Sequence, residues 1–269
     1  PEVVGTREAE EIRDACPYGA VDLDMQVREV PLKVGAVLWA TGWNSYDAGK
    51  ISYYGYGKHR NVVTNVIMER LASPGGPTGG RIVRPSDGGE VRKIAFIQCA
   101  GSRDENRLPY CSGVCCLASL KQATYLLQQN PQAEVVIFYI DIRAPGKYED
   151  FFAAVQAHER VRLIKGKAGE LTEDPPGSRV VVRCEDQSTG EILKEAFDLV
   201  VLATGMVPST ATEKIPATLT YDDHGFVLSR QGTPGIIGAG CVQHPVDVAS
   251  CVQDATAAAL KAIQALGRR

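Results

Sequence analysis

Short runs of consecutive apolar residues alternate in this chain with longer segments in which apolar residues recur every three or four positions. The short runs predict buried strands at 36–40, 94–98, 134–140, 161–164, 179–183 and 199–203. The longer segments predict helices at 62–71, 114–128, 149–157 and 246–266. Strands that alternate with helices in this way are typical of an α/β fold built on a parallel sheet.

Two segments depart from that alternation. Between residues 179 and 198, two strand candidates are joined through the polar turn Gln187–Gly190, which predicts an antiparallel hairpin. Residues 73–90 are rich in proline and glycine and have no apolar period, so they predict a linker.

Composition and charge narrow the class of protein. The 269 residues are 44% hydrophobic, enough for a large core, and 29 basic residues are balanced by 32 acidic ones. Because these charges form no long single-sign run, nucleic acid is not an expected partner. The longest apolar run, 135–140, is far shorter than the ~20 residues of a membrane helix, so no direct membrane span is expected. The chain begins without Met, and we interpret it as a piece of a longer protein.

Four of the eight cysteines lie close together in the sequence. Cys99 directly follows a predicted strand, Cys111 precedes a predicted helix, and Cys115 and Cys116 fall in the first turn of that helix. The carboxyl edge of a parallel sheet is where α/β folds place ligands, and a helix N-terminus stabilises thiolates. The segment therefore predicts a metal or redox site, and clustered cysteines without a secretion signal favour the cytoplasm.

The spacing of these cysteines leaves the bound group open. The four cysteines have the spacing C-x11-C-x3-C-C, which is neither a ferredoxin pattern nor the paired C-x2-C of zinc ribbons. An iron–sulfur cluster, a zinc ion and free or redox-active thiols therefore all remain candidates. Packing in a core explains at most one of Cys115 and Cys116, because neighbouring side chains on a helix point about 100° apart. Cys184 and Cys251, by contrast, are interpreted as packing residues.

Nicotinamide binding is disfavoured at the same place. A dinucleotide-binding unit carries G-x-G-x-x-G after such a strand, and here that position holds Cys99–Arg103. A flavin-dependent NAD(P)H oxidoreductase is therefore a weaker alternative.

Three glycine-containing stretches carry a family resemblance. VLWATG at 37–42 and VVLATG at 200–205 are strands with the same exit, and PGIIGAGC at 234–241 precedes the long helix. The combination resembles the flavoprotein disulfide reductase superfamily, in which a Rossmann-like domain is inserted into an FAD domain. The resemblance implies that Cys241 replaces an aspartate of the family and that the N-terminus of the long helix lies near the flavin ring. The residues that it implies as FAD contacts are Thr41, Gly42, Thr204, Gly205, Gly240, Cys241 and Val248.

A closer resemblance rests on the cysteine run itself. FIQCAGSRDENRLPYCSGVCCLASLKQATYL, followed by VIFYIDIRAPGKYEDF and preceded by YGYGKHRNVVTN and GPTGGRIVRPSDG, resembles the A subunits of heterodisulfide reductase and its relatives. Within that group it is most similar to the A subunit of the quinone-interacting membrane-bound oxidoreductase complex of sulfur-metabolising bacteria. The family pattern implies a [4Fe–4S] cluster held by Cys99, Cys111, Cys115 and Cys116.

The resemblance also implies a domain plan and a role. Residues 1–88 would contain the end of a ferredoxin-like insertion, to which Cys16 belongs, and a segment of the FAD domain. Residues 89–209 would form the Rossmann-like domain, and residues 210–269 would return to the FAD domain and end in its helix. The implied function is an oxidoreductase subunit that relays electrons between FAD and one-electron carriers in partner subunits, at the membrane periphery where a partner is membrane-bound. A zinc-stabilised docking module without a redox role is the alternative from another class.

Overall fold

The computed structural model describes residues 4–174, 179–229 and 235–267, and the chain divides into two compact units, Pro1–Gly35 and Ala36–Arg269. The first unit contains the helix α1 (Arg7–Ala15), which begins at Thr6, whose hydroxyl accepts a hydrogen bond from the Ala9 N–H. Directly after this helix, the Cys16 sulfur accepts a hydrogen bond from the backbone N–H of Ala20 at 3.4 Å. Cys16 is thus part of a local turn in the first unit.

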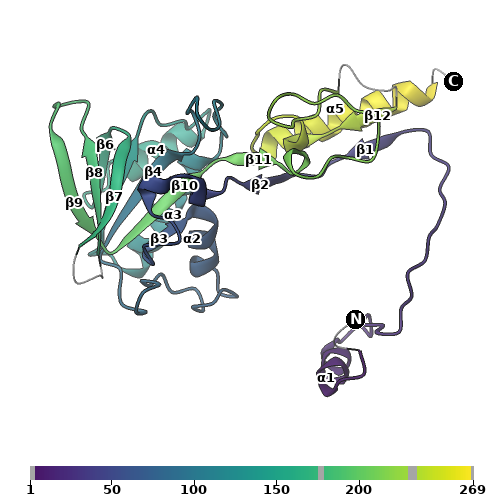
Figure 1. Cartoon of the computed structure of the whole chain (residues 1–269), viewed down its shortest axis with the longest axis horizontal. Helices are drawn as coiled ribbons and strands as arrows, with labels where there is room; N and C mark the ends of the chain where they lie inside the picture. The colour runs from purple at the N-terminus through teal and green to yellow at the C-terminus, as the bar shows by residue number, and fades with distance from the viewer. Residues whose placement is uncertain (1–3, 175–178, 230–234, 268–269) are drawn as a thin grey trace. The chain divides into compact units, whose positions relative to one another are not determined.

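A five-stranded parallel sheet forms the centre of the second unit (Figure 1). In spatial order its strands are β3 (Val62–Thr64), β10 (Leu199–Thr204), β4 (Lys93–Ala100), β5 (Glu134–Tyr139) and β6 (Val161–Lys165). All six residues of the inner strand β10 are buried. Its unbroken apolar run follows from this position, because a strand covered on both faces needs apolar side chains on both.

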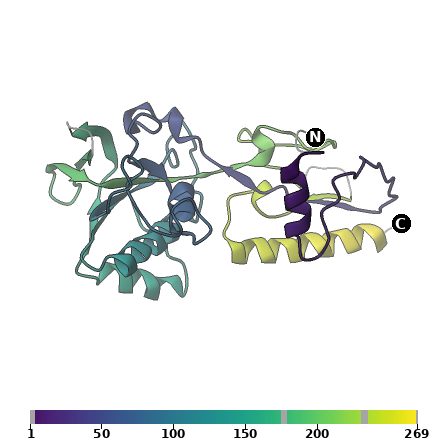
Figure 2. The ribbon, with the colours of Figure 1, turned by 90° about the horizontal axis from the view of Figure 1, so that it is seen from below.

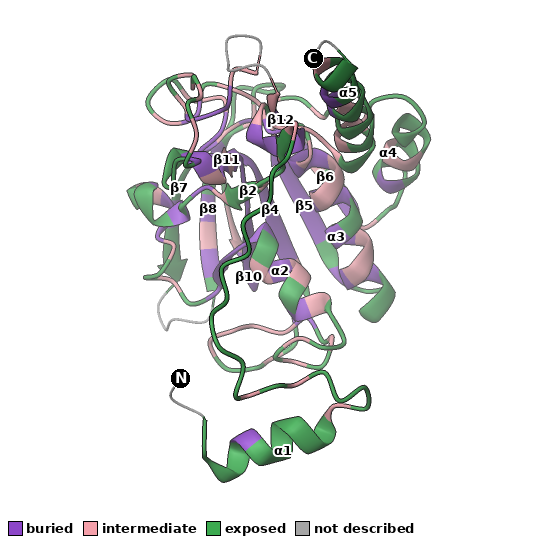
Figure 3. Cartoon of the chain, turned by 90° about the vertical axis from the view of Figure 1, so that its right-hand side faces the viewer, coloured by how far each residue is buried: buried purple, intermediate pink, exposed green. Residues whose placement is uncertain are grey.

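The two faces of this sheet are covered differently, so the domain has three layers. The helices α2 (Asn65–Ala72), α3 (Cys115–Gln129) and α4 (Tyr148–Gln156) cover one face. The antiparallel sheet of β7 (Ala168–Asp174), β8 (Arg179–Glu185) and β9 (Ile192–Phe197) covers the other, together with the short 3-10 helices η1 (Ala48–Lys50) and η2 (Ser52–Tyr54). Figure 3 shows β4, β5 and β10 as the buried centre between these layers.

A smaller sheet lies outside this three-layer domain. The strands β1 (Val37–Trp39) and β12 (Ile236–Gly238) pair in parallel, and the long helix α5 (Val248–Gly267) packs on them through Ala258 and Ala262. The strands β2 (Trp43–Ser45) and β11 (Met206–Pro208) pair antiparallel. They form a ribbon between the five-stranded sheet and the sheet of β1 and β12, which Figure 2 shows from below. The remaining 3-10 helices are η3 (Ser209–Ala211) and η4 (Gly240–Val242).

These observations confirm the predicted α/β class with its parallel sheet and its antiparallel hairpin. The hairpin gains a third strand, β7, which the sequence analysis did not identify. The segment predicted as a helix at 62–71 begins as the strand β3, and the helix starts only at Asn65, because Thr64 caps it through a hydrogen bond from the Ile67 N–H.

The segment 73–90 is not a linker between separate bodies. Ile82 is buried against the helical layer, its N–H donates to the side chain of Gln129 in α3 at 2.9 Å, and that side chain donates in turn to the Gly80 carbonyl at 2.7 Å. The strand β3 also joins the sheet from before the predicted boundary at residue 88. The three-part domain plan itself stays a prediction.

No helix in the described ranges combines the length and the apolar content that crossing a bilayer requires.

Candidate functional site

Cys99 lies at an irregular point near the end of β4. The register between β4 and β10 shifts here, since Leu202 pairs with Ile97 but Thr204 pairs with Ala100. The bulge puts Cys99 in the left-handed region at φ 55°, an uncommon conformation for a residue with a Cβ that costs about 1–2 kcal/mol. The thiol is buried. Backbone strain of this kind at a buried cysteine is typical of functional sites.

The residues after Cys99 fold back and return the chain to the end of the strand. Gly101 (φ 82°) and Arg103 (φ 53°) are also left-handed, and the Leu108 N–H donates to the Gly101 carbonyl at 3.1 Å. The Arg103 N–H donates to the Tyr110 carbonyl at 3.1 Å, which brings Cys111 back beside the turn. We call residues 99–116 the cysteine loop. Its fold explains how eleven intervening residues can separate two neighbouring thiols.

The other two cysteines begin the helix α3. Cys115 and Cys116 are both buried, and they point to different neighbours. The Cys115 thiol donates to the Thr204 carbonyl at the end of β10 at 3.5 Å, whereas Cys116 donates to the Asp141 carbonyl after β5 at 3.8 Å. The cysteine loop is therefore attached to the carboxyl ends of two strands that flank β4.

The four thiols are close enough to influence one another electrostatically. Burial, followed by the neighbouring thiol of Cys116, raises the pKa of Cys99 to about 11. Burial also raises the pKa of Cys115, and the three other thiols add to this effect. The pKa of Cys116 is raised by burial as well, with Cys111 contributing. Cys99, Cys111, Cys115 and Cys116 therefore lie within electrostatic reach of one another, and their role as ligands of one group stays a prediction.

The four thiols influence one another's pKa, but they do not form a closed coordination shell around a single metal ion. Among the described residues, no group of three or more His, Cys, Asp or Glu side chains has the geometry to hold a metal ion. Thiolates bound to a single zinc ion at about 2.3 Å would lie within about 4 Å of one another. Four thiols are, by their chemistry, the donor set that suits an iron–sulfur cluster.

Charged side chains surround the mouth of the cysteine loop. The guanidinium of Arg103 is hydrogen-bonded to the Asp141 carboxylate, and Arg143 Nε lies 3.7 Å from the same carboxylate. The Arg103 charge opposes the upward shift of the Cys99 pKa, which burial dominates. Asp141 follows β5, and its position beside Arg103 follows from the adjacency of β4 and β5.

The residues expected to contact FAD fall into two groups. Thr41 and Gly42 follow β1, and Gly240 and Cys241 follow β12, so the parallel pairing of these strands places all four at one edge. Val248 begins α5, which follows that edge and packs on the same two strands. Gly42 (φ 71°) and Gly240 (φ 68°) are left-handed, which lets the backbone approach a bound group closely. This edge is a suitable cradle for a cofactor.

Thr204 and Gly205 lie at the other end of the ribbon. Gly205 accepts a hydrogen bond from the Tyr46 N–H, while Gly42 accepts one from the Ser209 N–H, so the length of the β2–β11 ribbon separates the two Ala-Thr-Gly exits. Thr204 Oγ1 is buried and donates to Asn65 at 2.9 Å. The described contacts of Thr204 and Gly205 are with the cysteine loop, with Asn65 of α2 and with Ser45 and Tyr46, and a contact with FAD stays a prediction for both.

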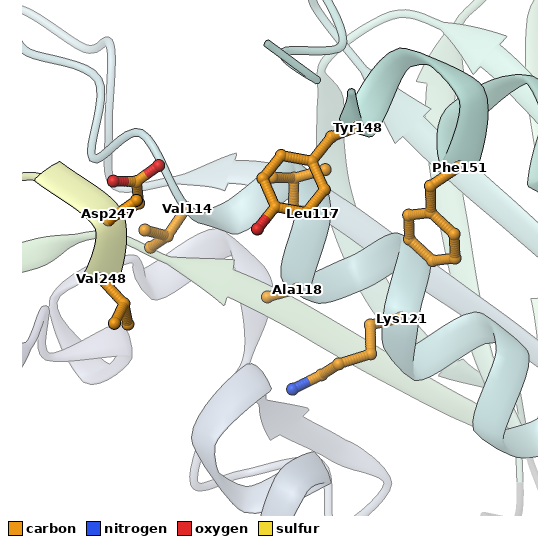
Figure 4. Close-up of a pocket in the computed structure, with 9 residues that line it drawn as sticks. Val114, Leu117, Ala118, Lys121, Tyr148, Phe151, Asp247 and Val248 are labelled. Carbon is orange, nitrogen blue, oxygen red and sulfur yellow. The ribbon is translucent and has the colours of Figure 1, made fainter. Parts of the chain in front are cut away.

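A cavity of about 370 Å³ lies beside the first turn of α3. Figure 4 shows Asp247, Val248 and Val114 together on one side of it, and Leu117 of α3 with Tyr148 and Phe151 of α4 toward the other. Val114 directly precedes Cys115, so this cavity connects the edge with the expected FAD contacts to the cysteine loop. The remaining lining comes mainly from apolar side chains of α3 and α4.

The arrangement of two sheets and a connecting ribbon is an α/β fold that solved thioredoxin reductase structures share. A solved thioredoxin reductase from Lactococcus lactis aligns with a TM-score of 0.55 at 17% identity, over 87% of this chain and 67% of that one. Another, from T. acidophilum, aligns with a TM-score of 0.52 at 19% identity, over 85% of this chain and 65% of that one. At these identities the likeness concerns the fold alone.

Over nearly all of its length, the sequence is similar to A subunits of heterodisulfide reductases. It is 39% identical over 259 residues to the second iron-sulfur A subunit of the CoB–CoM heterodisulfide reductase of Methanopyrus kandleri, covering 92% of this chain and 40% of the relative. It is 37% identical over 261 residues to the A subunit of the H(2):CoB-CoM heterodisulfide,ferredoxin reductase of Methanothermobacter thermautotrophicus, covering 93% and 40%. The chain thus spans about two fifths of the length of these curated relatives. No family model matches it.

Proposed function

We propose that this chain belongs to an electron-transfer subunit in which Cys99, Cys111, Cys115 and Cys116 hold a [4Fe–4S] cluster. The observation that carries this proposal is that Cys99 lies at the carboxyl end of β4, while Cys115 and Cys116 begin α3 and contact the ends of the two strands that flank β4. The name of the Methanopyrus kandleri relative, an iron-sulfur protein, supports an iron–sulfur group in this family. The left-handed backbone of Cys99 supports a dedicated role for this residue.

The chain's own groups suit an anionic bound group at this place. Thiolates at the start of α3 gain from the positive end of the helix dipole, and the Arg103 guanidinium lies beside Cys99. The Asp141 carboxylate orients this guanidinium from the neighbouring strand end. A cluster held here would accept and pass on single electrons, with a potential set by burial and by these charges.

We infer that the edge formed by Thr41, Gly42, Gly240, Cys241 and Val248 contributes to an FAD site, and that Thr204 and Gly205 belong to its margin near the cysteine loop. FAD supplies two-electron chemistry when it is bound. The role of the protein would be to hold the flavin within reach of the cysteine loop and to deliver electrons to partner subunits of a heterodisulfide reductase-type complex. The names of the relatives, which are those of single subunits, support the existence of such partners.

The test is the iron and acid-labile sulfide content of protein purified without oxygen, combined with EPR spectroscopy after reduction. We expect about four irons per chain, as a four-cysteine cluster requires, and a reduced-cluster signal that is lost in Cys115→Ser. The matched control is Cys184→Ser, a buried cysteine in β8 whose thiol donates to the Glu185 carbonyl of the same strand. This control should keep both the iron and the signal.

A specific result would favour the alternative. One zinc ion per chain, or no bound metal after anaerobic reconstitution with iron and sulfide, would refute the cluster. The zinc result would support a docking module without a redox role.

A further inference from the structure

A buried amide next to Cys99 has no hydrogen-bond partner. Gln98 directly precedes Cys99 in β4, and its side chain is buried at 2% exposure of the residue. Among the described residues, neither its Nε2 nor its Oε1 finds a donor or an acceptor. Folded proteins rarely leave a buried amide unpaired, because the loss of its hydrogen bonds with water is not compensated. The amide of Gln98 therefore points to a bound group or an ordered water beside it.

A second unpartnered group lies on α3. Ser119 is fully buried, and its Oγ has no hydrogen-bond partner in the part of the chain that the structure describes. Residues three and four apart share one face of a helix, and side chains lean toward the helix N-terminus, so Ser119 lies behind Cys115 and Cys116. The two unpartnered side chains thus neighbour three of the four predicted cluster ligands, Gln98 along the strand and Ser119 along the helix.

The pleat of β4 places Gln98 on the face that α3 covers. Ile94 and Phe96 occupy alternate positions before it, and both pack with Leu120 of α3 in the core between the sheet and the helices. Successive side chains of a strand point to opposite faces, so Gln98 continues this row. The first turn of α3 lies at the same end of the sheet, because Cys115 contacts the carbonyl at the end of β10. The amide of Gln98 is therefore enclosed between the end of β4 and the start of α3.

Another glutamine in the same layer shows what an amide with a structural role does here. Gln122, in α3, is fully buried, and its Nε2 donates to the Asn65 carbonyl and to the Glu69 carboxylate, both at 2.9 Å. These hydrogen bonds connect α3 to α2 and stabilise the fold. The Gln98 amide makes no such bond within the described residues, so the packing of the domain does not explain why this position is polar.

We propose that the Gln98 amide donates a hydrogen bond to a sulfur of the bound cluster, with the Ser119 hydroxyl as a second donor, and that these bonds raise its reduction potential. The inference rests on the proposed function, because it needs a cluster at the cysteine loop. Reduction adds one negative charge, and hydrogen bonds to the sulfurs stabilise the more negative form. The effect is strong at a buried site, where water does not screen it. Both donors keep their protons, so the step transfers one electron and nothing else.

The first measurement is the midpoint potential of the cluster, followed by EPR during a redox titration of the iron-loaded chain. Gln98→Met replaces the amide with an apolar side chain of similar length. We expect the ratio of reduced to oxidised cluster at a fixed potential to fall by about tenfold, which is about 59 mV for a one-electron couple. Ser119→Ala should lower the ratio in the same direction. Gln122→Met is the matched control, a buried glutamine whose amide is used within the fold, and should leave the potential unchanged.

The second measurement detects the hydrogen bond itself. The chain is prepared with ¹⁵N only in the side-chain amides of glutamine, loaded with iron and sulfide, and reduced. Pulsed EPR should then show a coupling between the cluster and one ¹⁵N nucleus. This coupling should disappear in Gln98→Met and persist in Gln122→Met. A wild-type chain with a reduced cluster and no such coupling would overturn the inference, and it would point to an ordered water as the partner of the amide.

The inference and the proposed function fail in different ways. A wild-type chain that binds no iron overturns the proposed function, and this inference with it. A wild-type cluster whose potential is unchanged in Gln98→Met overturns the inference alone. A shift of equal size in Gln122→Met would do the same, because the potential would then respond to any repacking of α3. If Gln98→Met loses its iron, the nitrogen coupling of the wild-type chain decides.

Discussion

Gly205 tests whether the fold of the cysteine loop depends on close packing against β10. A Cβ added at this position would lie 2.1 Å from Ser102 Oγ and 2.6 Å from Ser112 Oγ. Both hydroxyls belong to the cysteine loop and are buried. The substitution Gly205→Ala must therefore push one or both serines away from β10, and the cysteines move with them.

The expected loss of stability has two parts. Forcing a methyl group into a filled interior costs about 1–3 kcal/mol. Ser112 Oγ also accepts the hydrogen bond of the Met206 N–H at 2.8 Å, and a buried N–H that loses its partner costs about 1–3 kcal/mol. We expect Gly205→Ala to lower the free energy of unfolding by about 2–6 kcal/mol in total.

The assay is urea denaturation, with bound iron measured in parallel. Gly75→Ala is the matched control, because a Cβ there meets nothing within 4 Å, and it should change the free energy of unfolding by less than about 0.5 kcal/mol. Adding Ser102→Ala to Gly205→Ala removes the closer clash and should recover part of the loss. A Gly205→Ala variant as stable as the control would refute this account of the packing between β10 and the cysteine loop.

Three further predictions concern other parts of the second unit. Tyr54→Phe removes the buried hydrogen bond from the phenol to the Ala168 carbonyl at 2.9 Å and should cost about 1–3 kcal/mol in urea denaturation; an unchanged midpoint would contradict this. Asp198→Ala leaves the N–H groups of Arg92 and Lys93, at the start of β4, without their acceptor and should lower the free energy of unfolding by about 2–4 kcal/mol in the same assay. As a control, Glu11→Gln removes the exposed ion pair of Glu11 with Arg7 in α1 and should cost under about 0.5 kcal/mol. Because burial and the neighbouring Cys241 thiol raise the pKa of Cys251 above its ordinary 9.0, the rate of its alkylation should still rise with pH above 9; a rate that levels off below pH 8, measured at timed intervals, would contradict the shift.

The parts of the fold that the sequence predicted share one property. In each of these elements the apolar pattern is set by which of its own faces is buried. This holds for the strands β4, β5 and β10 and for the helices α3 and α5, and each was predicted within a few residues of its observed bounds. The strand β3 was missed because only Val62–Thr64 pair with β10 before Thr64 caps a helix, so the strand and helix patterns merge. The ribbon of β2 and β11 is equally short, and its pairing joins residues far apart in sequence.

The candidate site shows the same limit. Cys99, Cys115 and Cys116 could be placed from the sequence, because each lies next to a predicted strand or helix. The fold of the loop between Cys99 and Cys111 depends on left-handed residues with side chains, which no propensity predicts. The neighbourhood of Cys241 and Cys251 likewise depends on the contact between α5 and η4, which includes the hydrogen bonds of Asp254 to Gly240 and Gln243.

The position of β10 in the sheet has a consequence for biosynthesis. β10 is made long after the cysteine loop, yet it lies between β3 and β4 and supplies the carbonyl that Cys115 contacts. On a ribosome that adds about 5–20 residues per second, the four cysteines wait on the order of ten seconds before Thr204 exists. During that interval β3 and β4 lack the strand that lies between them, and the loop cannot reach its final packing. Maturation of the cysteine loop is therefore a late event that follows synthesis of the strand beside it.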